Sequence, residues 1–440
     1  MIRPFISLLH CAKGRTLLLS VMLFCTNLCA QEKLSLNEAI RIALEKNHGV
    51  QTATLLQSQA ELNNSAGAAG LLPLVTVEAG YNRNDLNLSQ KLSDGRLIER
   101  NAATSETYSA NARLSWTLFD GLVMFSRQSR LSSLEEESRL SLKLQMEETI
   151  QRVIAAYFAV ELEQENLLAL DELLKVDSIR VLLAEIRLQA GNGARPELLQ
   201  ARLEQNIHRG QRLSRMSQLD GQKENLNVLL GRDPATLFST TDTVSLADLR
   251  ADESTRSADL RLKLAEQQRQ TAFQWLKEAK GGRLPVITFD ANYAYNRTEN
   301  EAGFLLRNQN DGPGFGLNLR WNLFDGFRTS RTVRNSALDL RIAENRLGEQ
   351  LTLRQQEERK LQRDYLTQSE MVTLELESKT LAGENLLIAT ERLRAGLSTA
   401  LEIQEAQRSY ADAVARLALA RYTAKQTETE LLRLRGELLK

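Results

Sequence analysis

The sequence consists of two copies of one unit, and this duplication constrains the fold more than any other feature. Three short motifs occur twice in the same order, at a spacing of about 205 to 212 residues. The paired motifs are Leu72–Tyr81 with Leu284–Tyr293, Trp116–Gly121 with Trp321–Gly326, and Arg187–Gly191 with Arg392–Gly396. This period is far longer than that of solenoid repeats, so each copy is expected to be a substantial structural unit.

Each unit is expected to contain a helix, two short strands flanking a polar loop, a very long helix, a glycine-containing turn and another helix. The predicted first unit spans residues 31–232 and the second spans residues 258–440, with a linker or small equatorial domain over residues 233–257. The predicted strands are ~74–82, ~108–119, ~286–296 and ~314–324, with polar loops over residues 82–107 and 297–313. The predicted helices include one from about Ser35 to Gly70, two long ones at ~121–190 and ~327–394, and two shorter ones at ~195–230 and ~399–438.

Residues 1–30 have the pattern of a secretory signal peptide. Basic residues come first, without any acidic residue, and the apolar run of residues 17–24 follows before Ala30. This run is too short to span a membrane, although an N-terminal anchor is the alternative interpretation. All three cysteines of the sequence lie in this segment, at Cys11, Cys25 and Cys29. The exported chain is therefore expected to be held together by packing and not by disulfides.

The four predicted strands alternate between apolar and polar residues, as in Val75-Thr76-Val77-Glu78. A soluble sheet with one buried face would explain this period of two. A membrane β-barrel wall explains it better, because each strand has about 10 residues, the length that crosses a bilayer when tilted. Aromatic residues also lie near the strand ends, where membrane interfaces attract them: Tyr81, Trp116, Tyr293 and Trp321.

Four strands are too few to close a membrane barrel, and open strand edges in lipid would leave backbone groups without hydrogen bonds. The chain is therefore expected to pool its strands with copies of itself. With four strands per chain, two copies would give eight strands and three copies would give twelve. The strand pattern does not decide between these two assemblies.

The two longest helices are too long for a globular domain. No proline occurs between Asp120 and Gly191, and about 67 helical residues would reach roughly 100 Å. Apolar residues recur every seven positions, which predicts coiled-coil packing; a cytoplasmic coiled-coil rod is the alternative. Four residues mark the strand–helix junctions: Pro73, Gly121, Pro285 and Gly326.

With these paired motifs, nearly the whole exported chain resembles the TolC-like outer-membrane efflux protein family. The resemblance implies a mainly α fold with a small membrane β part, in which a trimer shares a 12-stranded β-barrel and a long coiled-coil α-barrel. It also implies a place in the outer membrane of a Gram-negative bacterium, in contact with outer-membrane lipid and extending into the periplasm. The implied partners are a periplasmic adaptor (membrane fusion protein) and an inner-membrane pump of the RND or ABC type.

The resemblance assigns roles to the turns that end the two long helices. It implies that they dock the adaptor, with the site residues Arg187, Leu188, Gly191, Arg392, Leu393 and Gly396. Glu402 and Glu405 match positions where the family often has an acidic ring at the closed entrance. Being three residues apart, they share one helix face, where carboxylates from several copies would favour cations. A solvated helix face is the alternative for this pair.

Residues typical of enzymes and cofactor sites are missing from the sequence. It contains no His-Glu-x-x-His, Cys-x-x-Cys, phosphate-binding glycine loop or Gly-x-Ser-x-Gly motif. Equal numbers of basic and acidic residues, 56 each, give no electrostatic signature of nucleic-acid binding. His208 is interpreted as an interhelical residue, and the acidic pairs Glu147-Glu148 and Glu357-Glu358 as solvated or interhelical charges.

We therefore expect a passive exit duct of a tripartite efflux pump, with no catalytic residue, metal or cofactor. The channel of a type I protein secretion system would have the same fold and is the first alternative. A periplasmic scaffold or adaptor is the second, although an adaptor would need compact β-domains around a single helical hairpin.

Overall fold

The computed structural model describes residues 32–246 and 259–439. The predicted signal peptide and much of the predicted linker lie outside these residues. Contacts within the chain define two compact units. Among the described residues, the first unit comprises 32–43, 153–245 and 377–422, and the second comprises 44–152, 246, 259–376 and 423–439. Four of the five boundaries between the units cut through helices, because the longest helices contribute to both units.

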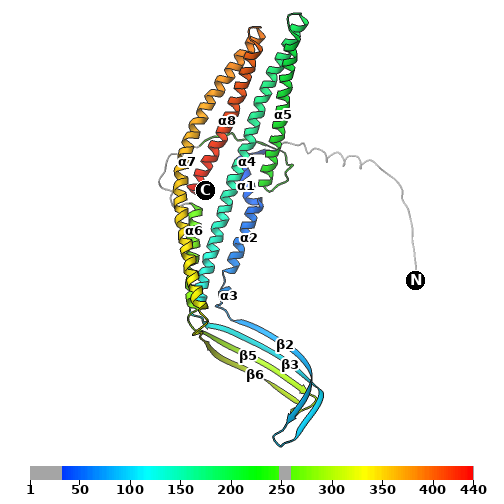
Figure 1. Cartoon of the computed structure of the whole chain (residues 1–440), viewed down its shortest axis with the longest axis vertical. Helices are drawn as coiled ribbons and strands as arrows, with labels where there is room; N and C mark the ends of the chain where they lie inside the picture. Colours follow the sequence, from blue (N-terminus) through cyan, green and yellow to red (C-terminus); the bar gives the residue numbers. More distant parts are fainter. Residues whose placement is uncertain (1–31, 247–258, 440) are drawn as a thin grey trace, which may run out of the picture. The chain divides into compact units, whose positions relative to one another are not determined.

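The second unit contains one antiparallel sheet of four strands (Figure 1). The strands are β2 (Leu74–Lys91), β3 (Leu97–Phe119), β5 (Val286–Asn300) and β6 (Arg307–Arg320), in the spatial order β2-β3-β5-β6. Within the part of the chain that the structure describes, the outer edges of β2 and β6 pair with no other strand. Apolar side chains on one face are exposed, with Val77 at 76% and Phe315 at 84%. This is the mainly α fold with a small four-stranded part that the sequence predicts.

The strands differ in length from the predicted ones. The polar segment after Tyr81 continues β2, since Asn82 pairs with Thr107 and Asp85 pairs with Thr104. Backbone hydrogen bonds need no apolar side chain, so a hairpin continues past the end of the apolar pattern. At the other end, β6 stops at Arg320, about four residues before the predicted limit of residue 324.

The predicted first helix is divided into α1 (Leu36–Lys46), α2 (His48–Asn63) and α3 (Ala66–Ala69). The breaks coincide with residues that cap a new helix. The Asn47 side chain accepts hydrogen bonds from the amides of Gly49 and Val50, and the Ser65 hydroxyl accepts one from Ala68. Such short polar side chains compete for the backbone and so favour helix starts over helix interiors.

The remaining helices follow the duplicated order. They are α4 (Val123–Gln189), α5 (Arg195–Leu229), α6 (Leu260–Gly281), α7 (Arg328–Arg394) and α8 (Ala400–Leu434). Helices α4 and α7 have 67 residues each, which corresponds to about 100 Å of helix. No helix in the described part of the chain has an apolar stretch long enough to cross a membrane.

The first unit has an apolar core formed by α4, α7 and α8. Its buried members are Leu170, Leu173, Val176, Leu386, Ala389, Leu393, Ile403 and Ala406. The predicted seven-residue pattern is only partly buried in the single chain. On α4, Val153 and Val160 are fully buried, whereas on α7 each of Leu374, Leu381 and Ile388 is 58% exposed.

A small parallel pair, β1 (Glu32–Leu34) and β4 (Phe238–Thr240), packs in the first unit. The buried Tyr157 hydroxyl donates to the Leu34 carbonyl at 2.8 Å and accepts from the amide of Thr241 at 3.1 Å. Nearby, the Glu161 Oε1 accepts from the Val244 amide at 3.1 Å, while its buried Oε2 has no partner. Burial raises the pKa of Glu161 to about 7. The start of the predicted linker is thus fastened to α4.

Candidate functional site at the helical tips and strand–helix junctions

The two helical tips have the same backbone geometry. Gly191 and Gly396 follow the long helices with φ of 74° and 75°. After the first tip glycine, the Asn192 amide donates to the Arg187 carbonyl at 2.9 Å; after the second, the Leu397 amide donates to Arg392 at 2.8 Å. This left-handed helix ending satisfies the last carbonyls and favours glycine, because a side chain is strained there.

The predicted docking residues at the tips differ in burial: Gly191, Arg392 and Gly396 are exposed, Arg187 and Leu188 are half-buried, and Leu393 is buried. Leu393 is only 6% exposed and belongs to the apolar core, so of the predicted docking residues it is the one that holds α7 in place. Arg187 reaches across the turn to Glu197 on α5 at 3.3 Å. Of the predicted docking residues, Arg187, Leu188, Gly191, Arg392 and Gly396 therefore remain accessible at the tips.

Glu402 has a local structural role that the sequence analysis missed. Its amide donates to the Thr399 hydroxyl at 3.2 Å, and its Oε2 accepts in return from the Thr399 amide at 3.4 Å and also from the Ser398 hydroxyl at 2.8 Å. This reciprocal arrangement is a capping box, and the Thr-x-x-Glu spacing before α8 is its sequence signal. The hydrogen bond from Ser398 is the main cause that lowers the pKa of Glu402. Glu405 lies one turn further along α8 and is exposed.

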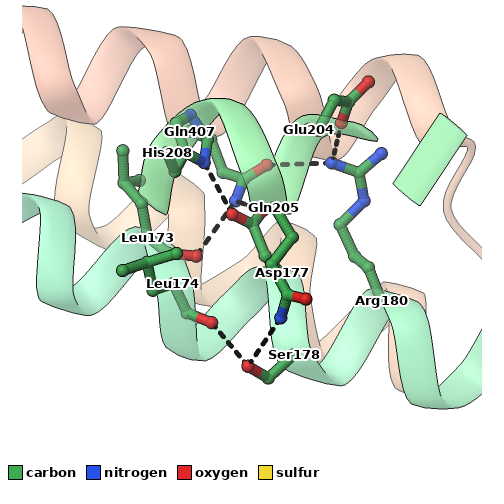
Figure 2. Close-up of polar contacts among 9 residues, drawn as sticks. All are labelled: Leu173, Leu174, Asp177, Ser178, Arg180, Glu204, Gln205, His208 and Gln407. Carbon is green, nitrogen blue, oxygen red and sulfur yellow. Dashed lines mark hydrogen bonds and ion pairs between the residues drawn. The ribbon is translucent and has the colours of Figure 1, made fainter. Parts of the chain in front are cut away.

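Below the tips, a buried polar network joins the two helical hairpins (Figure 2). It comprises Asp177 and Arg180 on α4, Glu204 and His208 on α5, and Gln407 on α8. Gln407 donates to Asp177 Oδ1 at 2.8 Å and accepts from Arg180 at 3.1 Å. Asp177 and Gln407 are 1% and 2% exposed. Burying the carboxylate of Asp177 and the amide of Gln407 costs free energy unless each has hydrogen-bond partners. The network therefore specifies how α8 packs on the first hairpin.

His208 completes this network from the solvent side. Its Nδ1 lies 2.6 Å from Asp177 Oδ2, and Arg180 forms a short ion pair with Glu204. The interpretation of His208 as an interhelical residue agrees with this position. No group of three or more metal-ligating side chains occurs among the described residues.

The strand–helix junctions of the two copies differ in their packing. Both Gly121 and Gly326 have positive φ, 77° and 67°. A Cβ on Gly121 would overlap the Gly281 carbonyl oxygen, whereas a Cβ on Gly326 would meet nothing within 4 Å. Only the first junction therefore needs glycine for close packing as well as for its backbone conformation.

The two tryptophans make equivalent contacts beside these junctions. The Trp116 indole N–H donates to the Leu71 carbonyl at 3.0 Å, and the Trp321 indole N–H donates to the Arg283 carbonyl at 3.1 Å. In each copy the acceptor lies two residues before the junction proline, Pro73 or Pro285. In each copy, the indole therefore links the end of the second strand to the segment just before the first strand.

Two tyrosines mark the other end of the apolar strand pattern. Tyr81 donates to Glu106 at 3.1 Å and Tyr293 donates to Asp311 at 3.3 Å, in each case across to the neighbouring strand. Each strand pair thus has an aromatic residue with a polar tip at both ends of its apolar face, as membrane interfaces favour.

Comparison with known proteins identifies the family of this fold. The family model described as outer membrane efflux protein matches residues 39–232 and again residues 253–437. The chain belongs to the outer membrane efflux protein family. No curated protein sequence matches the chain significantly.

Solved structures of outer-membrane efflux channels have the same fold as this outer membrane efflux protein. The chain is 17% identical to the outer membrane protein VceC of Vibrio cholerae, with a TM-score of 0.73 and coverage of 91% of this chain and 96% of that one. It is 16% identical to the outer membrane channel CmeC of Campylobacter jejuni, with a TM-score of 0.79 and coverage of 91% and 85%. The open-state channel MtrE of Neisseria gonorrhoeae is 18% identical, with a TM-score of 0.73 and coverage of 92% and 89%.

Family membership places this outer membrane efflux protein in the outer membrane, with its helices extending into the periplasm. The sheet of β2, β3, β5 and β6 has an exposed apolar face, which suits such a location. The polar face of the sheet carries Arg113 and Asp290, 3.5 Å apart.

Proposed function

We propose that three copies of this chain form one outer-membrane exit duct, through which a tripartite efflux pump passes its cargo. The observation that supports this most directly is the open four-stranded sheet, whose outer strands β2 and β6 have no partner in the described chain. Backbone groups left open in lipid cost several kcal/mol each, roughly, so the edges must pair with strands of other copies.

The exposed apolar column of α7 supports the same assembly. Leu374, Leu381 and Ile388 are each 58% exposed at seven-residue intervals. Such a column is typical of a helix that packs against another helix of a coiled coil. In a trimer these side chains would face a neighbouring copy, and the helices would continue the barrel as a tunnel.

The number three comes from similarity to the family, as do the partners. We infer that a periplasmic adaptor docks on the tips around Gly191 and Gly396 and opens the entrance, and that an RND or ABC pump supplies the cargo. The duct performs no chemistry. We also propose that Glu402 and Glu405 of the three copies form an acidic ring at the entrance, where carboxylates would favour cations.

The experiment that tests this function measures the mass of the protein extracted from outer membranes in mild detergent. A trimer that dissociates to monomers only on heating, together with restored drug export in a strain lacking its own duct, is the expected result. A monomer that stays in solution without detergent would contradict the proposal.

A further inference from the structure

The first two turns of α7 carry an exposed basic face that the export function does not explain. Arg328, Arg331 and Arg334 follow one another at three-residue spacing and are all exposed. Residues three apart lie on neighbouring positions of a helix surface, so the three guanidinium groups share one face. That face is opposite to Val333 and Ser336, which are 8% and 1% exposed.

None of the three arginines forms an ion pair in the described part of the chain, although the charge of Arg328 does act on the nearby Asp325. The nearest carboxylate along the chain, Asp325, accepts hydrogen bonds from the Thr329 amide and hydroxyl at 2.9 and 2.5 Å. It therefore caps the helix. Three like charges on neighbouring turns repel one another, and Asp325 offsets only that of Arg328, so Arg331 and Arg334 are left without a compensating ion pair among the described residues.

The duplicated unit shows that the fold itself does not require this charge. The equivalent residues at the start of α4 are Val123, Ser126 and Ser129, none of which is charged. The arginines that α4 does have there, Arg127 and Arg130, both pair with Glu278, at 2.9 and 2.7 Å. The same helix start thus exists with its charges neutralised in one copy and unpaired in the other.

An exposed apolar rim adjoins the basic face. Trp321 is 54% exposed, Leu323 79%, Phe324 75% and Phe327 73%. The rings of Phe324 and Phe327 are in edge contact with centroids 5.4 Å apart. Phe327 directly precedes the first of the three arginines, Arg328. In the sequence, Trp321 and Leu323 also continue the alternation of Leu317 and Leu319, which are exposed on the apolar face of β6. The basic face therefore adjoins the apolar side of the sheet through this rim.

The depth of the arginines matches the headgroup layer of a bilayer. From Arg328 to Arg334 the helix rises about 9 Å, and the headgroup region on each side of the hydrocarbon core is roughly 5 to 8 Å thick. Aromatic residues such as Trp321 mark the boundary between the two layers. The guanidinium groups therefore begin where the phosphates of the periplasmic leaflet are.

We propose that Arg328, Arg331 and Arg334 bind the phosphate groups of anionic phospholipids in the periplasmic leaflet of the outer membrane. Arginine matches this ligand because its planar fork donates two hydrogen bonds to one phosphate. The face anchors the second strand–helix junction at a fixed depth, while the first junction is anchored by its own ion pairs. The proposal rests on the outer-membrane location alone and not on the export role.

The test is native mass spectrometry of the detergent-solubilised protein with phosphatidylglycerol and phosphatidylcholine of equal chain length. The wild type is expected to retain phosphatidylglycerol preferentially. Each basic side chain near an anionic surface contributes roughly fivefold, so R328Q/R331Q/R334Q should lower the ratio of the two bound lipids by about a hundredfold. The matched control R341Q/R346Q/R359Q removes three exposed arginines further along α7 and should keep the wild-type ratio.

Further variants distinguish lipid binding from contact with another copy and from binding of soluble anions. R328K/R331K/R334K keeps the charge and should keep most of the preference, and each single glutamine variant should lower it by roughly fivefold. An unchanged ratio in R328Q/R331Q/R334Q overturns the proposal. So does a variant that falls apart into monomers with an unchanged ratio, because the arginines then contact another copy. Displacement of phosphatidylglycerol by millimolar inorganic phosphate would assign the face to soluble anions and overturn it too.

Discussion

At the scale of single residues, the duplication provides natural pairs of positions with different surroundings. Gly121 and Gly326 occupy equivalent places and both precede a second residue with positive φ, Leu122 at 66° and Phe327 at 63°. Only Gly121 also lies against another backbone, that of Gly281. The same motif therefore has a conformational role in both copies and a packing role in one.

Replacing each glycine by alanine should separate the two roles. Gly326→Ala should cost about 1 to 2 kcal/mol, the usual penalty for a side chain in the left-handed region. Gly121→Ala should cost about 1 to 3 kcal/mol more, because its Cβ would overlap a backbone oxygen that cannot turn away. Thermal unfolding of both variants in detergent measures this difference; equal midpoints would show that the close approach to Gly281 is unimportant.

Glu402 combines a capping role with a proposed place in the acidic ring. The Glu402→Gln, Glu405→Gln double variant keeps a capping side chain at position 402, because glutamine also serves in a capping box. We expect lower cation preference and weaker block by divalent cations in single-channel recordings, since the carboxylate charge is lost. A control with Glu370→Gln and Glu384→Gln, two exposed glutamates on α7, should behave as wild type. Unchanged selectivity in the double variant would rule out the ring.

At the scale of secondary-structure elements, buried polar contacts join helices whose packing the sequence pattern does not predict. Gln407 is the contribution of α8 to the network of Asp177, Arg180, Glu204 and His208 (Figure 2). Because Asp177 is 1% exposed, its carboxylate depends on these donors in place of water.

Gln407→Ala should therefore destabilise the helical part by roughly 2 kcal/mol, through the hydrogen bonds lost at Asp177 and Arg180. Gln404→Ala on the exposed side of α8 is the control and should change stability by less than about 0.5 kcal/mol. Denaturant unfolding followed by circular dichroism gives both values. If the two variants were equally stable, the network would not be what fixes α8.

The tips test the docking proposal at the same scale. Gly191→Asp and Gly396→Asp add a charge in open space on the tip; a Cβ on Gly191 meets nothing within 4 Å, and one on Gly396 meets only the Arg187 guanidinium at 3.7 Å. Aspartate tolerates the left-handed conformation better than most residues, so we expect assembled protein with reduced drug export. Gly231→Asp introduces the same change at another helix end of the same type, where φ is 66°. Export at the wild-type level in both tip variants would argue against docking there.

At the scale of the whole molecule, the unpaired strand edges and the exposed apolar surface of the single chain indicate how copies of it assemble. The edges of β2 and β6 pair with no other strand that the structure describes (Figure 1). The exposed apolar column of α7 is a separate feature of the same chain. Each is costly for an isolated protomer, the first through open backbone groups in lipid and the second through apolar surface in water.

Leu381→Glu places a charge in the middle of the α7 column and should reduce the fraction of assembled trimer without unfolding the protomer, because Leu381 is 58% exposed in the single chain. Thr373→Glu adds the same charge at an exposed polar position nearby and is the control. Size measurement in detergent distinguishes the two. A fully assembled Leu381→Glu variant would show that this column faces solvent in the duct.

The sequence by itself determined the duplicated order of elements, the four alternating strands and the long helices, because periodicity, proline and glycine act locally. Local signals also located the tips Gly191 and Gly396. The same patterns underestimated β2, since backbone pairing continues between polar residues such as Asn82 and Thr107. They also missed the helix breaks at Asn47 and Ser65, although both are ordinary capping residues.

Only the tertiary structure decided which polar residues meet inside the helical bundle and which of the two matching strand–helix motifs is tightly packed. Asp177 and Gln407 are 230 positions apart in the chain. Gln404 and Gln407 are about one helical turn apart on α8, and no local pattern shows which of the two meets a polar partner. Gly121 and Gly326 likewise follow the same Leu-Phe-Asp sequence but have different neighbours in space. Contacts of this kind depend on how elements distant in sequence pack, which a period or a motif does not encode.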